Sequence, residues 1–227
     1  DVREFLQTLR DAGLGSLPGT AAEILDDEVR QRICPDKLSS AEWLAIVETA
    51  HSLGIASTAT IMFGHVERPV HWATHLLQLR RLQARSGGFT EFVPLPFVAE
   101  QAPMFVDGGS RAGPTWREAL LMHAVARLVL HPLVRNVQAS WVKLGPQGMR
   151  RCLAAGANDY GGTLIDERIS SAAGGVHGTA LTPAAIEQAI ADCGRRPWQR
   201  DTLYRDVADE RRRAASPAFL HACPVAA

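Results

Sequence analysis

The residues that could do chemistry in this chain lie in three short stretches, the first of which is residues 18–23. Its Pro18-Gly19 turn leaves a short apolar segment and exposes backbone N–H groups, and Glu23 could accept hydrogen bonds from a ribose diol. The same glutamate would also suit the first turn of a helix, where the helix dipole favours a negative charge. The stretch therefore indicates either a nucleotide-binding turn or an ordinary helix start.

The second stretch is residues 55–65. Its first nine residues carry no charge and are rich in β-branched side chains, which predicts a buried strand. Because strand side chains alternate between faces, Ile61 and Phe63 share one face. The opposite face carries two hydroxyls and a thioether, from Thr58, Thr60 and Met62. If helices cover the apolar face, the other face is built to hold something polar.

Gly64 and His65 end this strand, at the position where α/β barrels place their ligands. His65 is therefore predicted to be either a ligand-binding or catalytic group or a hydrogen-bonded structural residue. The third stretch places unusual polarity at the ends of two later apolar segments, at Gln138, Ser140, Asn158 and Asp159. Polar groups on the inner face of a barrel need hydrogen-bond partners, and a substrate is one kind of partner.

Other patterns favour structural interpretations. His71 and His75 have the spacing of a helical zinc pair, but Trp72 stands where a metalloprotease has its catalytic glutamate. No Walker A loop, G-x-S-x-G elbow or G-x-G-x-x-G motif occurs. The four cysteines are isolated from one another, at positions 34, 152, 193 and 223. We therefore expect reduced, mostly buried thiols and no metal site built from these cysteines.

Composition narrows the class of protein. The 227 residues include 24 Lys and Arg against 24 Asp and Glu, so no overall charge favours nucleic acid or an anionic membrane as a partner. No apolar run approaches the roughly 20 residues of a membrane span, and the first residues do not resemble a signal peptide. We expect a soluble, cytoplasmic protein without a nucleic-acid or membrane partner.

Apolar periodicity and turn residues predict strands and helices in alternation along residues 1–200. Pro94 and Pro96 cannot donate ladder hydrogen bonds and are expected to end the third strand. Five βα units predict an α/β fold with a parallel sheet, a partial (β/α) TIM-type barrel. Residues 201–227 are predicted to form a separate charged C-terminal tail. The predicted strands are residues 14–17, 55–63, 89–93, 136–144 and 161–165.

These stretches belong to longer runs that resemble the C-terminal part of a family of radical S-adenosylmethionine enzymes, the tyrosine-consuming subunit or half of deazaflavin (FO) synthase. Aminofutalosine-type enzymes of menaquinone biosynthesis share several of the runs in weaker form. The runs from Thr90 to Pro94 and from Arg196 to Tyr204 favour the deazaflavin branch. The matching runs are residues 18–24, 32–35, 58–65, 87–97, 138–145, 158–164 and 196–204.

The resemblance implies a fold, an activity and site residues. It implies the C-terminal five or so βα units of a radical SAM barrel, in a transferase that uses S-adenosyl-L-methionine and a 4Fe–4S cluster. That family joins the 4-hydroxybenzyl group of L-tyrosine to 5-amino-6-(D-ribitylamino)uracil, and a ring-closing radical SAM subunit or domain is a further partner. The implied cofactor-binding residues are Glu23, Thr58, Thr60, Met62, Gly64 and Pro94. The implied substrate-facing residues are His65, Gln138, Asn158 and Asp159.

One departure from the family is large, because the C-x3-C-x2-C motif that holds the cluster does not occur in this sequence. The chain also begins near the family's middle strands. We expect either a part of an active enzyme, whose missing N-terminal barrel half carries the cluster, or a cluster-free remnant that binds substrate or acts as a scaffold. A metal-dependent hydrolase using His65 and His71 is disfavoured, since no acidic pair accompanies these histidines at ligand spacing.

Overall fold

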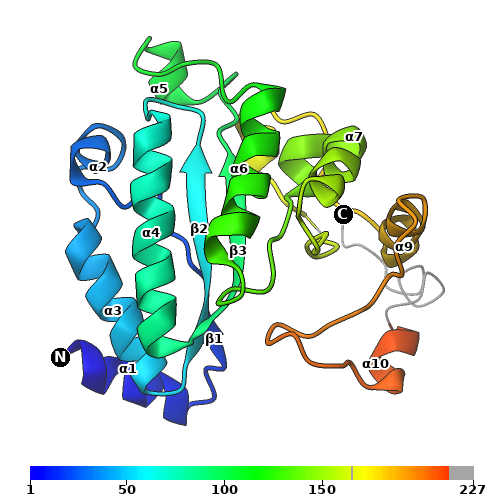
Figure 1. The fold of residues 1–227 in the computed structure, drawn as a ribbon, viewed down its shortest axis with the longest axis horizontal. Helices are drawn as coiled ribbons and strands as arrows, with labels where there is room; N and C mark the ends of the chain where they lie inside the picture. Colours follow the sequence, from blue (N-terminus) through cyan, green and yellow to red (C-terminus); the bar gives the residue numbers. More distant parts are fainter. Residues whose placement is uncertain (165, 215–227) are drawn as a thin grey trace.

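The computed structural model describes residues 1–164 and 166–214. Three strands form a parallel sheet in the order β1-β2-β3, with bounds Ser16–Leu17, Ala56–Phe63 and Phe89–Pro96. Figure 1 shows α4 and α6 crossing the same face of β2 and β3, with α3 beside α4. The helices are α1 (Val2–Asp11), α2 (Asp27–Ile33), α3 (Ser40–Ser52), α4 (Pro69–Ser86), α5 (Pro103–Val106), α6 (Trp116–Leu130), α7 (Trp141–Ala154), α8 (Ile169–Ala172), α9 (Pro183–Ala191) and α10 (Asp209–Ala214).

Local sequence signals explain where the helices that cover the sheet begin and end. The Ser39 side chain accepts from the backbone N–H of Glu42, whose carboxylate in turn accepts from the N–H of Ser39. Thr115 and Glu118 form the same reciprocal cap at the start of α6. Gly87 ends α4 in the left-handed conformation that glycine adopts without strain. These caps set the helix ends independently of the sheet.

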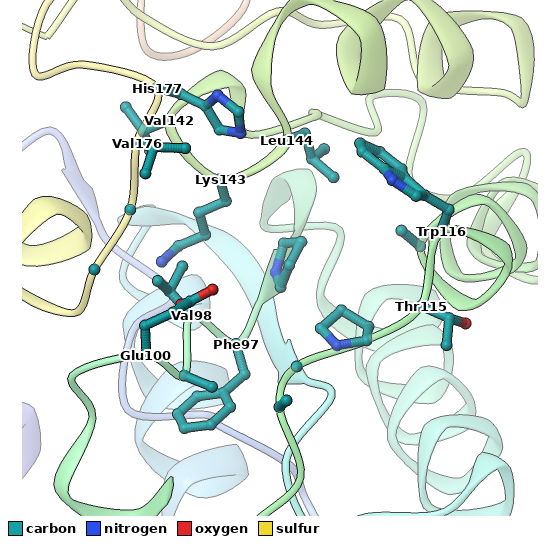
Figure 2. Close-up of a pocket in the computed structure, with 18 residues that line it drawn as sticks. Phe97, Val98, Glu100, Thr115, Trp116, Val142, Lys143, Leu144, Val176 and His177 are labelled. Carbon is teal, nitrogen blue, oxygen red and sulfur yellow. The ribbon is translucent and has the colours of Figure 1, made fainter. Parts of the chain in front are cut away.

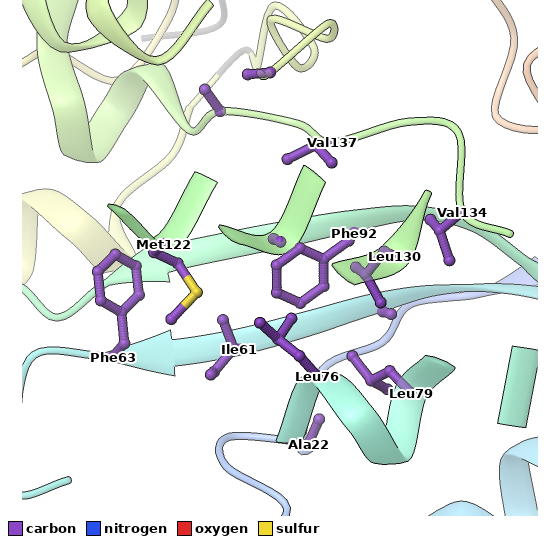
Figure 3. Close-up of a cluster of buried hydrophobic side chains, with 14 of the residues drawn as sticks. Ala22, Ile61, Phe63, Leu76, Leu79, Phe92, Met122, Leu130, Val134 and Val137 are labelled. Carbon is purple, nitrogen blue, oxygen red and sulfur yellow. The ribbon is translucent and has the colours of Figure 1, made fainter. Parts of the chain in front are cut away.

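The main apolar core lies between the sheet and helices α4 and α6 (Figure 3). The predicted alternation of β2 is confirmed, because Ile61 and Phe63 are fully buried against these helices. The Phe63 ring meets Trp72 edge to face at 5.6 Å between centroids. Leu76 from α4 and Met122 from α6 complete the layer. The apolar face of β2 is therefore closed, and its other face is left for polar residues.

Parallel pairing continues beyond β3 as single bridges. Phe92 pairs with Val137, and Gln138 pairs with Asp159, both in parallel orientation. The segments around residues 137 and 159 thus extend the row of β1, β2 and β3 by two further positions. Each of the five positions is followed along the chain by at least one helix.

Two predicted strands were wrong in extent. Residues 136–144 pair only at their start, since Trp141 already begins α7. The apolar run Trp141 to Leu144 suits a buried helix as well as a strand, so periodicity could not separate the two. Residues 161–164 form no strand, because Gly161 and Leu164 adopt left-handed backbone angles (φ 81° and 50°) that extended chains exclude. Residue 165 lies outside the described residues.

The expectation that Pro94 would end the third strand was also wrong, since β3 continues to Pro96. The backbone N–H of Phe92 points away from β2 and donates to the Asn136 carbonyl (2.9 Å), whereas that of Phe97 donates to Phe63 (2.8 Å). Pro94 and Pro96 follow Phe92 by two and four residues, so their backbone nitrogens also face away from β2. The N–H groups that proline lacks would therefore not have bonded to β2. The β2–β3 ladder therefore passes both prolines intact.

The C-terminal segment divides into two parts within the described residues. Residues 200–206 return to the sheet and contact it through side chains described below. Helix α10 is charged and largely exposed. Residues 215–227 of the predicted tail lie outside the described residues. Among the helices described, none combines the length and apolarity needed to cross a bilayer.

His75 of α4 is completely buried, and its Nδ1 accepts a hydrogen bond from the backbone N–H of Leu25 (3.0 Å). Burial lowers the pKa of His75 to about 3, because the charged ring would have no water around it. Its ring therefore belongs to the core, whereas the Nδ1 of His71 accepts from the N–H of Arg68 at the start of the helix. This arrangement argues against the two histidines acting as a zinc pair.

The buried neutral ring of His75 predicts a pH dependence. The unfolded histidine binds a proton below about pH 6.5 and the folded one does not, so the free energy of unfolding should fall as the pH falls below 6.5. This group should contribute about 1.4 kcal/mol per pH unit until about pH 3. Urea unfolding at several pH values measures the slope. His75→Gln should show a shallower slope, and equal slopes would contradict the prediction.

Candidate functional site

The face of the sheet turned away from α4 and α6 carries a row of polar side chains. We call it the polar face. Its residues come from β2, from β3 and from the two bridged segments that follow. They are Thr58, Thr60, Met62, Glu91, Gln138 and Asp159.

The two threonines of the polar face hold the Pro18-Gly19 turn. The backbone N–H of Gly19 donates to Thr58 Oγ1 (2.6 Å), and Thr60 Oγ1 donates to the Gly19 carbonyl (2.5 Å). A Cβ at position 19 would overlap the Thr58 carbonyl, so only glycine permits this approach. Each hydroxyl keeps further capacity: Thr58 still has its own proton to donate, and Thr60 still has lone pairs that can accept.

Glu23 lies beside the end of β2. Its carbonyl accepts from the backbone N–H of Met62 (2.9 Å), and one carboxylate oxygen, Oε1, pairs with the Lys37 ammonium (2.7 Å). Within residues 1–164 and 166–214, no donor bonds its Oε2. Glu23 also holds a left-handed backbone conformation (φ 46°), which costs a non-glycine residue about 1 kcal/mol or more and is typical of functional sites.

Gly64 and His65 turn the chain sharply after β2. Gly64 has φ 102°, and a Cβ there would overlap Pro114. The His65 ring is buried, its Nδ1 accepts from the N–H of Val66 (2.8 Å), and its Nε2 lies 3.1 Å from the Met62 carbonyl. Burial lowers the pKa of His65, so the neutral ring with its proton on Nε2 fits these contacts. Both ring nitrogens thus bond to the backbone in this structure.

Glu67 organises the same turn and was missed by the sequence analysis. Its buried carboxylate accepts from the backbone N–H groups of Gly64 (2.6 Å) and His65 (2.8 Å), from Trp72 Nε1 (3.0 Å) and from Arg111 (3.3 Å). Burial alone would raise the pKa of Glu67, but the backbone N–H groups of Gly64 and His65 that donate to its carboxylate keep that pKa below its ordinary value. An acidic residue two positions after the Gly64-His65 pair was the available signal.

A second cluster joins β3 to the C-terminal segment. Tyr204 Oη lies 2.6 Å from Glu91 Oε2 and 2.7 Å from Asp159 Oδ2. Arg200 donates to Asp159 through Nε (2.9 Å) and stacks over the Tyr204 ring at 4.3 Å. Gln138 Nε2 donates to Glu91 (2.8 Å). Tyr204 holds a left-handed backbone angle (φ 61°), a strain that the cluster must offset.

The contacts in this cluster require a proton on one of its two carboxyl groups. The Tyr204 hydroxyl has a single proton, yet its oxygen lies within hydrogen-bond distance of two carboxyl groups. If that proton goes to Asp159, which also pairs with Arg200, the short contact with Glu91 requires a proton on Glu91. Burial raises the pKa of Glu91, in agreement with this assignment. These contacts predict a proton on Glu91, whose Oε2 also lies 3.6 Å from Arg200 Nη2.

The assignment predicts unequal effects of two matched substitutions. Glu91→Gln replaces a neutral acid with a neutral amide of the same shape and should change the free energy of unfolding by less than about 1 kcal/mol. Asp159→Asn removes the carboxylate that pairs with Arg200 and should cost about 2 kcal/mol. Urea unfolding of both variants at pH 7 compares them. A larger cost for Glu91→Gln than for Asp159→Asn would show that Glu91 is ionised.

The structure brings some predicted site residues together and separates others. Gln138 and Asp159 meet in the cluster, through Glu91 and Tyr204. Asn158 is exposed and turns away, where its Oδ1 accepts from Arg127 (2.6 Å) and from the N–H of Val137 (2.8 Å). Pro94 is buried in β3 opposite Ile61. His65 forms no hydrogen bond with Gln138 or Asp159 in the described part of the chain.

Sequence reasoning missed Glu91, Arg200 and Tyr204 as single residues, although all three lie in runs that carried the resemblance. A charged residue inside the apolar run 89–97 was the available signal for Glu91. Nothing in the pattern indicated that residues 196–204 return to β3, because the contact joins positions more than a hundred residues apart.

No group of three His, Cys, Asp or Glu side chains within the described residues is placed to hold a metal ion. Cys34, Cys152 and Cys193 are free thiols. Burial raises the pKa of Cys152 to about 12, so this thiol is protonated and inert at neutral pH. These cysteines agree with the expectation of reduced thiols, while Cys223 lies outside the described residues.

Comparison with known proteins decides the family. Residues 86–211 match the family described as the CofH/MqnC C-terminal region. The chain belongs to this family. The match includes β3, Gln138, Asp159 and the Arg200–Tyr204 segment, so it covers the whole polar cluster.

Individual relatives of this CofH/MqnC chain are similar over nearly its whole length. It is 51% identical over 208 residues to a 5-amino-6-(D-ribitylamino)uracil--L-tyrosine 4-hydroxyphenyl transferase of Methanothermobacter thermautotrophicus, covering 92% of this chain and 57% of the relative. A transferase of the same name from Methanocaldococcus jannaschii is 47% identical, with 90% and 57% covered. FO synthase of Streptomyces coelicolor is 51% identical over 221 residues, with 97% and 25% covered. The chain thus spans little more than half of the transferases it matches.

Proposed function

We propose that this chain is the C-terminal part of a radical S-adenosylmethionine transferase that moves the 4-hydroxybenzyl group of L-tyrosine to 5-amino-6-(D-ribitylamino)uracil, in deazaflavin cofactor biosynthesis. The observation that carries the proposal is 51% identity over 92% of the chain to a transferase named for these two substrates. The alternative branch, aminofutalosine-type enzymes of menaquinone biosynthesis, is not favoured by these relatives.

The proposal includes a finer fold assignment. Five consecutive parallel positions, three strands and two bridges, support the C-terminal five or so βα units of a (β/α) barrel over residues 1–200, with residues 201–227 as a tail. The polar face would then be the inner wall of the barrel. The remaining units would come from a region corresponding to the part of the longer relatives that this chain does not match. That barrel half is the first partner we propose.

The residues present fit an adenosyl group on the polar face. Glu23 Oε2 is open to a ribose hydroxyl, and Thr58 and Thr60 retain one donor and one acceptor beside it. S-Adenosyl-L-methionine, when reduced by an iron–sulfur cluster, supplies the radical in this chemistry. Met62 and Gly64 would border the same site from the end of β2, whereas Pro94 pairs with Ile61 on the apolar face and is not assigned to it.

The residues present do not fit the 4Fe–4S cluster itself. The described cysteines are scattered, and no three potential ligands gather within residues 1–164 and 166–214. We therefore assign the cluster ligands to the proposed N-terminal barrel half and no electron-transfer step to these residues.

Polar groups of the second cluster suit the ribitylaminouracil. Gln138 and the neutral acid Glu91 offer an amide and a carboxyl group on the inner wall, and Asp159 and Tyr204 hold Glu91 in place. His65 would border the substrates from the end of β2, whereas Asn158, which turns toward Arg127, is not assigned to them. We further propose a cytoplasmic location and a ring-closing radical SAM subunit or domain as the partner that takes the product.

Glu23 should matter for cofactor affinity. Glu23→Gln removes a charged acceptor from the ribose and should weaken S-adenosylmethionine binding at least about tenfold, because a hydrogen bond to a charged group contributes about 1.5–3 kcal/mol. Calorimetric titration of the protein, with whatever its gene encodes on either side of this chain, measures the affinity. Glu48→Gln, in an exposed pair with Arg85, is the matched control and should bind normally. Equal affinities of both variants would contradict this role.

The activity is tested by isotope transfer. The same protein, loaded with iron and sulfide under anaerobic conditions, is supplied with a reductant, S-adenosylmethionine, ring-labelled L-tyrosine and the ribitylaminouracil. The proposal predicts an adduct whose mass contains the labelled hydroxybenzyl group. A protein that binds iron and S-adenosylmethionine but yields no labelled adduct would contradict the assigned reaction, and one that binds neither would favour the scaffold alternative.

A further inference from the structure

A pocket of about 220 Å³ lies where β3 ends and α6 and α7 begin (Figure 2). Its walls come from residues 96–100 after β3, residues 112–119 around the start of α6, residues 142–144 of α7 and residues 174–177. The volume is below the roughly 300–1,000 Å³ of drug-sized sites, which restricts an occupant to one small molecule. The carboxyl ends of parallel strands are the usual place for such sites.

Lys143 reaches into this pocket from the first turn of α7 (Figure 2). Its amine donates to Ser170 Oγ (3.2 Å), and the ion pairs among the described residues include none with Lys143. Burial lowers the pKa of Lys143, as expected for an amine partly withdrawn from water. Glu167 acts on the Lys143 amine from beyond ion-pair distance and partly opposes this shift of the pKa. A half-buried ammonium with no ion pair among the described residues is costly, and an anionic group of a ligand would supply a closer partner.

Glu100 lies on the same side of the pocket as Lys143, and their side chains extend toward a common space (Figure 2). The two opposite charges do not pair with each other at 4.0 Å or less in the part of the chain described. Trp116 and Leu144 line the pocket on the other side. One end of the pocket therefore offers one charge of each sign, and the other offers an aromatic and an aliphatic wall.

We propose that this pocket binds an aromatic amino acid as its zwitterion, with the carboxylate on Lys143, the ammonium on Glu100 and the ring against Trp116. The inference rests on the proposed function, where L-tyrosine is a substrate, and assigns that substrate to named residues outside the polar cluster. Gln138 and Glu91 then remain for the uracil substrate.

Ligands that lack one charge test each contact. Calorimetry of the protein, with any flanking sequence its gene encodes, compares L-tyrosine, tyramine without the carboxylate, and 3-(4-hydroxyphenyl)propionate without the ammonium. The wild type should bind tyrosine at least tenfold more tightly than either analogue. Lys143→Met should bind tyrosine and tyramine equally, whereas Lys143→Arg should restore the preference. Glu100→Gln should lose the preference for tyrosine over the propionate.

Controls separate this inference from the proposed function. Arg85→Gln removes a positive charge on the outer surface of α4 and should leave both preferences intact, and circular dichroism verifies that each variant folds. If labelled adduct forms but folded Lys143→Met still prefers tyrosine over tyramine, the pocket assignment is overturned and the function stands. If Lys143 and Glu100 govern both preferences but no adduct forms, the pocket stands and the reaction fails. A wild type that binds tyrosine no better than either analogue also overturns the assignment.

Discussion

Phe63→Ala is expected to lower the free energy of unfolding by about 3–5 kcal/mol. Phe63 is fully buried at the end of β2, and its ring meets Trp72 edge to face. Alanine would remove the ring and leave a cavity between β2, α4 and α6, where the neighbours are already close-packed. Urea unfolding followed by tryptophan fluorescence and circular dichroism measures the loss.

Val70→Ala on α4, the helix that carries Trp72, is the control. Val70 is 55% exposed, so its truncation should change the free energy of unfolding by no more than about 0.5 kcal/mol. Similar costs for Phe63→Ala and Val70→Ala would mean that helix α4 does not cover the apolar face of β2. In that case the polar face would not be the free face of the sheet, and the placement of the site would fail with it.

Glu67→Ala is expected to cost about 3–5 kcal/mol, because it strands several buried N–H donors and each unsatisfied buried donor costs about 1–3 kcal/mol. The Glu67 side chain is fully buried, and its removal would strand the donors of Gly64, His65 and Trp72 together with part of Arg111. The turn after β2 would lose the group that fixes it. We therefore expect a lower Tm and faster hydrogen exchange at the Gly64 and His65 amides.

Glu118→Gln provides the matched comparison, because Glu118 pairs with the same guanidinium of Arg111 but is 25% exposed. A partly solvated pair contributes little, and glutamine still accepts from the cap of α6, so the expected cost is below about 1 kcal/mol. Equal costs for Glu67→Ala and Glu118→Gln would show that the turn is held by the sheet rather than by the buried carboxylate.

Much of the fold followed from local signals. The alternation of residues 55–63 predicted which face of β2 would be buried. The caps at Ser39 and Thr115 set the starts of α3 and α6 through residues only three positions apart. The error at Pro94 came from a property that sequence does not carry, namely which neighbour each N–H of β3 faces. The run after Ser140 was misjudged because an apolar segment suits a buried helix and a strand equally.

The candidate site was predictable only in part. Thr58, Thr60 and Glu23 lie along β2, as the polar strand face and the nearby turn predicted. Their bonds to Gly19 and Lys37 were not predictable, because these partners are distant in the sequence. The contact between Glu91 and Tyr204 spans 113 positions, and local spacing contains no information about it. The role proposed for Lys143 depends on its pocket and on the absence of an ion pair with it among the described residues, and neither follows from local sequence.

Photoaffinity labelling with an azido-adenosyl analogue of S-adenosylmethionine tests most directly whether the polar face forms the ligand chamber. After irradiation and proteolysis, labelled peptides are located by mass spectrometry, with and without excess S-adenosylmethionine. The account predicts competed label within residues 18–23 and 56–65, beside Glu23 and the two threonines. Competed label confined to the outer surfaces of α4 and α6, with the polar face unlabelled, would contradict it.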